Sequence, residues 1–95
     1  MPDYLVEPVS PSEAKRLIAE ILKTGTYRFS SHAEQEMVKD NLTTVDCVNV
    51  LRGGWVDSCD CERGTWRYRV CTNLIYVVVA FRSPTALTVV TAWGK

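Results

Sequence analysis

The sequence has no apolar run long enough to cross a bilayer: the longest, "LIYVVVAF" at residues 74–81, has eight residues. A membrane-spanning helix needs about 20 such residues, whereas a run this short suits a buried strand. The first nine residues, "MPDYLVEPV", also lack the basic and apolar pattern of an export signal. We therefore expect a cytoplasmic protein that has no membrane contact and keeps its cysteines reduced.

The motifs of several large enzyme classes are absent as well. There is no glycine-rich phosphate loop, no H-E-x-x-H zinc motif and no Ser-His-Asp order. No linker, internal repeat or low-complexity segment divides the chain, so we expect one domain over residues 1–95. We predict neither a cofactor nor a metal ion.

The net charge of zero hides an uneven distribution. Residues 1–61 hold six Lys or Arg and ten Asp or Glu, whereas residues 62–95 hold five Lys or Arg and one Glu. The basic half could bind a polyanion, and the acidic half could not. The alternative is that the two halves neutralise each other within one fold.

Helix signals fill the first half of the chain. The segments 10–25, 30–41 and 43–54 each begin with hydroxyl residues that can cap a helix, and the first and third end in glycine. The expected caps are Ser10, Ser30 or Ser31, and Thr43. Apolar residues recur at helical spacing in each segment, and on the third the predicted apolar side is Val45, Val48 and Leu51.

Strand signals fill the second half. The segments 55–61, 65–71, 74–81 and 86–93 are rich in β-branched and aromatic residues. We therefore predict an α+β domain in which the N-terminal helices pack on one face of a roughly four-stranded antiparallel sheet. The predicted core includes Leu17, Ile21, Met37, Val48, Trp66, Val77 and Val79.

The second and third strands can be placed in register. A two-residue turn at Thr72-Asn73 would pair Arg69 with Tyr76, and side chains then alternate between the two faces. The predicted core face carries Trp66, Tyr68, Val70, Ile75, Val77, Val79 and Phe81. The predicted open face carries Arg67, Arg69, Cys71, Tyr76, Val78, Ala80 and Arg82, and so brings three arginines together.

The single histidine, His32, is expected in the first turn of the second helix. The positive end of the helix dipole disfavours a protonated imidazole there, and a neutral imidazole can act as a general base. One histidine with several arginines suits attack by an RNA 2′-hydroxyl on its own phosphate, which needs no metal. The alternative is that His32 is an ordinary polar residue near a helix cap.

The four cysteines, Cys47, Cys59, Cys61 and Cys71, also leave two alternatives open. Structural zinc sites usually use pairs spaced C-x₂₋₄-C, and "CDC" at residues 59–61 is tighter than that. Four thiols could still converge on zinc. The simpler interpretation, which we adopt, is that all four are reduced thiols without a metal.

The stretch "YRFSSHAEQEMVKDNLTTVDCVNVLRGG", followed by "RYRV", "VVVAF" and "LTVVTAW", resembles a family of small bacterial domains with an H-A-x-x-R-M motif. That family is similar to the RelE, MqsR and BrnT ribonuclease toxins. The resemblance covers residues 26–95 and is best at His32, Ala33 and Met37. Glu36 stands where the family usually has arginine, which removes a positive charge four residues from His32.

The resemblance implies a RelE-like fold and a metal-independent endoribonuclease, the toxin of a toxin–antitoxin pair. Its partners would be mRNA, free or ribosome-bound, and an inhibitory antitoxin protein. The implied catalytic residues are His32, Arg67 and Arg69, and the implied RNA-binding residues are Arg82, Tyr76 and Lys95.

The alternative function is a non-catalytic protein-binding module on the same fold. Tyr76, Val78 and Ala80 make the predicted open face partly apolar, which would suit a protein partner or a homodimer. Mutations should separate the two faces: Arg69→Ala is expected to cost less than about 0.5 kcal/mol in stability. Trp66→Ala is expected to cost roughly 3–5 kcal/mol as a core truncation.

Overall fold

Each helix begins beside the hydroxyl that was predicted to cap it. The computed structural model describes residues 5–95, so the prediction about the first nine residues falls partly outside the described chain. The helices are α1 (Pro11–Thr24), α2 (Ser31–Lys39) and α3 (Thr44–Gly53). Ser10, Ser30 and Thr43 each accept a hydrogen bond from the backbone N–H three residues on, which satisfies a donor that the helix leaves free.

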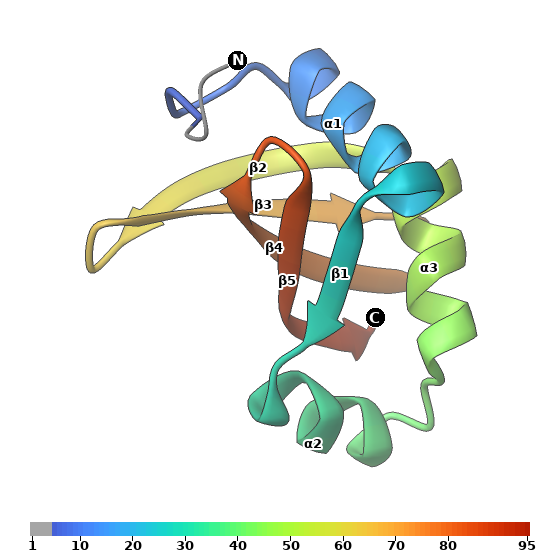
Figure 1. Cartoon of the computed structure of the whole chain (residues 1–95). Coiled ribbons are helices and arrows are strands. Elements are labelled where there is room, and N and C mark those ends of the chain that lie inside the picture. The colour runs from blue at the N-terminus through green and yellow to red at the C-terminus, as the bar shows by residue number, and fades with distance from the viewer. Residues whose placement is uncertain (1–4) are drawn as a thin grey trace.

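Within residues 5–95 the sheet has five strands and is mixed, so the prediction of a roughly four-stranded antiparallel sheet is wrong in this detail. The strands are β1 (Thr26–Phe29), β2 (Trp55–Glu62), β3 (Thr65–Cys71), β4 (Ile75–Ser83) and β5 (Ala86–Gly94). Their order is β1-β5-β4-β3-β2, and only β1 runs parallel to its neighbour. The α+β class itself is confirmed (Figure 1).

The strand that the prediction missed, β1, has four residues and lies at the edge of the sheet. It pairs with β5, some 60 residues later, with Arg28 opposite Thr88. Such a short segment gives a weak alternation signal. Its parallel pairing with the last strand is also a tertiary contact that no local pattern encodes.

The β3–β4 hairpin turns one residue later than predicted. Cys71 pairs with Tyr76 and Arg69 with Val78, because the turn is Asn73-Leu74 rather than Thr72-Asn73. The backbone N–H of Thr72 donates to the carbonyl of Ile75 at 3.0 Å and closes this turn. The register therefore shifts by two residues. A shift of two keeps every side chain on its predicted face, whereas a shift of one would reverse them.

The core lies between the three helices and one face of the sheet. Five of the seven core residues that were predicted are buried: Leu17, Ile21, Met37, Val77 and Val79. Trp66 is half-buried and packs against the core edge. Figure 1 shows α1 and α3 side by side along the sheet, with α2 following directly after β1.

The buried side of α3 differs from the predicted one. Cys47, Val50 and Leu51 are buried, whereas Val45 is 64% exposed and Val48 is half-buried outside the core cluster. Cys47, Val50 and Leu51 also recur at helical spacing, so the helix has two apolar stripes and either could face the core. Val45 and Val48, which belong to the stripe that is not buried, line a surface hollow.

Candidate functional site

The second face of the sheet is not covered by any helix of residues 5–95, because the buried residues of all three helices belong to the core cluster on the first face. We call this second face the open face. Its basic residues are Arg28, Arg67, Arg69, Arg82 and Lys95. Its acidic residues come from β2 and are Asp57, Asp60 and Glu62. The structure therefore places the three predicted arginines on one face, with Arg67 and Arg69 in one hollow and Arg82 in another, and adds a row of carboxylates.

Arg69 is held in place by Asp57. Its Nε and Nη2 donate to the two carboxylate oxygens at 2.8 and 3.0 Å, a bidentate ion pair. Asp57 is the extra residue of a bulge in β2. The hydrogen bond from Arg69 lowers the pKa of Asp57, and the same hydrogen bond raises the pKa of Arg69. Arg69 is therefore a satisfied cation before any ligand arrives.

Tyr76 lies at the centre of a cationic and aromatic cluster beside this ion pair. The guanidinium carbon of Arg69 is 4.6 Å and the Nζ of Lys95 is 4.4 Å from the centroid of its ring. The ring of Trp93 is 5.0 Å away, tilted by 33°. Cations over a tyrosine ring are attracted by its quadrupole. Tyr76 and Lys95, two of the predicted RNA-binding residues, thus lie together on the open face.

Arg67 also faces carboxylates. Its Nη1 lies 3.2 Å from Glu62, and Asp60 is opposite it in the β2–β3 register. Its Nε is buried and has no hydrogen-bond partner within the described residues. Arg67 and Arg69 share a hollow of about 200 Å³ with Asp60 and Glu62. A phosphate in this hollow would meet carboxylates as well as guanidinium groups.

A second hollow of the open face, about 310 Å³, carries positive charge without carboxylates. Arg28 and Arg82 both line it, and none of its lining residues is acidic. Nε of Arg82 donates to the hydroxyl of Thr88 at 3.1 Å. Neither arginine forms an ion pair with a carboxylate of residues 5–95. This end of the face is therefore the better site for an anion.

Arg28 is a candidate site residue that was not predicted from the sequence. The alternation in "TYRF" is a weak signal for it: Tyr27 and Phe29 alternate with Arg28, which pairs with Thr88 in the sheet. Arg82, by contrast, was predicted as an RNA-binding residue, and the structure places it beside Arg28.

His32 is exposed in the first turn of α2 and lines neither the hollow that contains Arg67 and Arg69 nor the hollow that contains Arg28 and Arg82. The three predicted catalytic residues are thus not brought into one hollow. The cap of α2 does lie against the sheet: the hydroxyl of Ser30 donates to the carbonyl of Val90 at 2.9 Å. His32 follows Arg28 by four residues, since β1 leads directly into α2.

All four cysteines are free thiols, and Cys47 and Cys71 are buried. Burial raises the pKa of Cys47 to about 11, and it also raises the pKa of Cys59 and Cys71. These thiols are therefore protonated at neutral pH, and zinc requires thiolates. In the described part of the chain, no three His, Cys, Asp or Glu residues gather as they would around a metal ion.

Comparison of the chain with models of protein families, with curated proteins and with solved structures gives no match in any of the three. Within residues 5–95, no helix is long and apolar enough to span a membrane.

Proposed function

We propose that this protein binds RNA on the open face of its sheet and cleaves it as a metal-independent endoribonuclease. One observation carries the proposal: Arg28 and Arg82, neither of which has a carboxylate partner within residues 5–95, line one hollow, and the strand of Arg28 leads into the helix of His32. Guanidinium groups bind phosphate through paired donors, so two free arginines in one hollow suit a phosphodiester.

The chemistry follows from these groups. The imidazole of His32 accepts the proton of a 2′-hydroxyl, and the hydroxyl oxygen forms a bond to the adjacent phosphorus. Arg28 and Arg82 stabilise the extra negative charge on the phosphorane. The bond from phosphorus to the 5′-oxygen then breaks, this oxygen takes up a proton from water, and the imidazolium of His32 returns its proton to the solvent. The products are a 2′,3′-cyclic phosphate and a 5′-hydroxyl.

The other end of the open face would hold the neighbouring nucleotides. Trp93 is half-buried and offers ring surface on which an unpaired base can stack. The ring of Tyr76, by contrast, is covered by Arg69 and Lys95 until one of these cations moves to a phosphate. Arg67 can exchange Glu62 for a phosphate, because the Glu62 side chain is 60% exposed and such ion pairs are weak. Arg69 is less available while Asp57 holds it at two points.

The biological setting belongs to the same proposal. A toxin of this kind acts on cytoplasmic mRNA, free or ribosome-bound, and an antitoxin protein inhibits it. This assignment is supported by the resemblance around His32, and the open face supplies the surface on which mRNA would lie.

The test is cleavage of end-labelled single-stranded RNA by the purified protein in excess EDTA. We expect cyclic-phosphate products, and we expect Arg28→Gln, Arg82→Gln and His32→Gln each to reduce the rate by a factor of about 10² or more. Arg16→Gln is the matched control, because Arg16 lies exposed on α1, outside the open face. Equal losses in all four variants, or cleavage that EDTA abolishes, would contradict the proposal.

A second candidate is a non-catalytic protein-binding module. The ion pairs Arg69–Asp57 and Arg67–Glu62 favour it, because they leave half of the open face nearly neutral. The open face exposes less apolar surface than was predicted, since Ala80 is fully buried and Val78 is half-buried. A binding module predicts neither RNA cleavage nor RNA binding that depends on Arg28 and Arg82.

A further inference from the structure

The outer edge of β1 has free backbone groups. The N–H groups of Thr26 and Ser30 donate to carbonyls of the β5 segment, each at 3.0 Å. In a parallel pair, every second residue of a strand directs both its N–H and its C=O to the neighbouring strand, and the residues between them direct theirs to the opposite side. The N–H and C=O groups of Tyr27 and Phe29 therefore point away from β5. β1 is the last strand of the sheet on this side, so within residues 5–95 no strand pairs with them.

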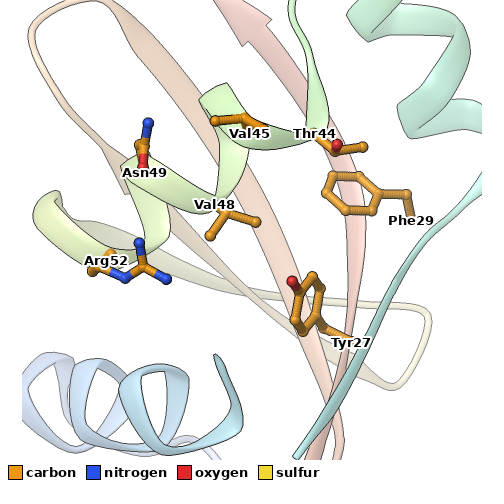
Figure 2. Close-up of a pocket in the computed structure, with 7 residues that line it drawn as sticks. All are labelled: Tyr27, Phe29, Thr44, Val45, Val48, Asn49 and Arg52. Carbon is orange, nitrogen blue, oxygen red and sulfur yellow. The ribbon is translucent and has the colours of Figure 1, made fainter. Parts of the chain in front are cut away.

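An apolar hollow of about 430 Å³ lies beside this edge, between β1 and α3. Figure 2 shows Tyr27 and Phe29 on β1 facing Val48 of α3 across the hollow. Val45 and Tyr27 are 64% and 41% exposed, respectively. A strand added to the edge of β1 would direct alternate side chains toward α3 and cover these residues.

The charge of the hollow indicates what kind of strand would fit. Arg52 is the only charged residue among those lining it, and it forms no ion pair within the described chain. A segment that carries a carboxylate would therefore be complementary. A second copy of this chain would instead bring the Arg28 side chains of two β1 strands together, which opposes self-pairing.

We infer that the edge of β1 is a docking site for an extended acidic segment of a partner protein. The segment adds a sixth strand to the sheet through the backbone groups of Tyr27 and Phe29. Its apolar side chains, at alternate positions, fill the hollow, and one carboxylate pairs with Arg52. The hollow of this site lies beside α3 and contains neither Arg28 nor Arg82, and Tyr27 is the one residue that lines both this hollow and the hollow proposed for RNA.

Selection from a phage-displayed library of random 12-residue peptides tests this inference with a defined probe. We expect enriched peptides that alternate apolar residues and carry Asp or Glu. Val45→Glu and Arg52→Glu should each weaken their binding at least tenfold. Replacing the acidic residue of the peptide by Lys should restore binding to Arg52→Glu.

Val38→Glu is the matched control, because Val38 is an exposed valine on α2 that does not line the hollow. It should leave peptide affinity unchanged. The bound peptide should also slow hydrogen exchange of the Tyr27 and Phe29 amides, which pairing with a new strand requires. Arg82→Gln should not change peptide binding, so failure of the RNA proposal is observed separately.

Four results would overturn the inference. In the first, no peptide is enriched on the native chain above a Val45→Glu decoy. In the second, the enriched peptides bind Val45→Glu as tightly as the native chain. In the third, they bind without slowing hydrogen exchange of the Tyr27 and Phe29 amides. The fourth is a dimer in sedimentation experiments that Val45→Glu dissociates, because the occupant would then be a second copy of the chain.

Discussion

Asp57→Asn tests how the open face is organised, because it removes one charge without changing the shape of the side chain. Asp57 holds Arg69 through two hydrogen bonds, and the two side chains are 26% and 37% exposed, respectively. Exposed ion pairs contribute about 0.2–1 kcal/mol, and bidentate geometry favours the upper end. We expect a loss of about 1 kcal/mol at pH 7, or roughly 4–8 °C in Tm.

The stabilisation by the Asp57–Arg69 ion pair should depend on pH. Because Arg69 lowers the pKa of Asp57 in the folded state, the unfolded state binds protons more readily at this site. The stabilisation is thus complete above the unfolded pKa of about 4 and is lost as the pH falls through the folded pKa. Thermal or urea unfolding should show the full difference between native and variant proteins at pH 7, and this difference should shrink as the pH is lowered below about 4.

Asp60→Asn is the control, because Asp60 lies on the same strand and face but forms no ion pair in the described chain. It should change stability by less than about 0.5 kcal/mol. Asp57→Asn should also free Arg69 for RNA, raising affinity and steepening the salt dependence by about 0.7 in log–log slope per added phosphate contact. Equal stability of native protein and Asp57→Asn at pH 7, or weaker RNA binding by the variant, would refute this reasoning.

Three further predictions concern the frame of the fold. Gly54→Ala should destabilise by roughly 1–3 kcal/mol in urea unfolding, because the added Cβ would lie 2.4 Å from a strand carbonyl. Gly53→Ala has no atom within 4 Å of its Cβ and should not destabilise. Tyr68→Phe should cost about 1–3 kcal/mol in the same assay, because the buried hydroxyl accepts from the N–H of Val9 at 3.0 Å. Thiol titration of the native protein should find Cys61, the only exposed cysteine, the fastest to react.

The helices could be predicted because their boundaries are encoded locally. Ser10, Ser30 and Thr43 satisfy backbone N–H groups within three residues of themselves, so the signal and its partner lie in one short segment. The choice of the buried side of α3 is different. Two stripes of apolar residues exist on that helix, and only the position of the sheet decides which of them is buried.

The alternation of side chains along β3 and β4 is also encoded locally. The predicted faces are correct although the turn was placed wrongly, because the error in register was two residues. The candidate site depends on contacts between residues that are far apart in the sequence. The partnership of Arg69 with Asp57 requires the register of β2 against β3, including the bulge, and nothing in the β3 sequence encodes it. For that reason the stability cost expected for Arg69→Ala rises from less than about 0.5 to about 1 kcal/mol. Trp66→Ala should cost less stability than the roughly 3–5 kcal/mol of a fully buried aromatic residue, since Trp66 is only half-buried.

The position of β1 links the two proposals and explains why their tests can be read separately. Successive side chains of a strand point to opposite faces, so β1 contributes Arg28 to the open face and Phe29 to the hollow beside α3, while Tyr27 lines both that hollow and the hollow of Arg28 and Arg82. A strand added to its outer edge would pair with Tyr27 and Phe29 and leave the guanidinium of Arg28 on the RNA side. An acidic partner at this edge would still hold β1 in place, and β1 leads into the helix of His32. Peptide binding that alters the rate of RNA cleavage while Arg82→Gln leaves peptide affinity unchanged would therefore indicate coupling through β1, not competition for one surface.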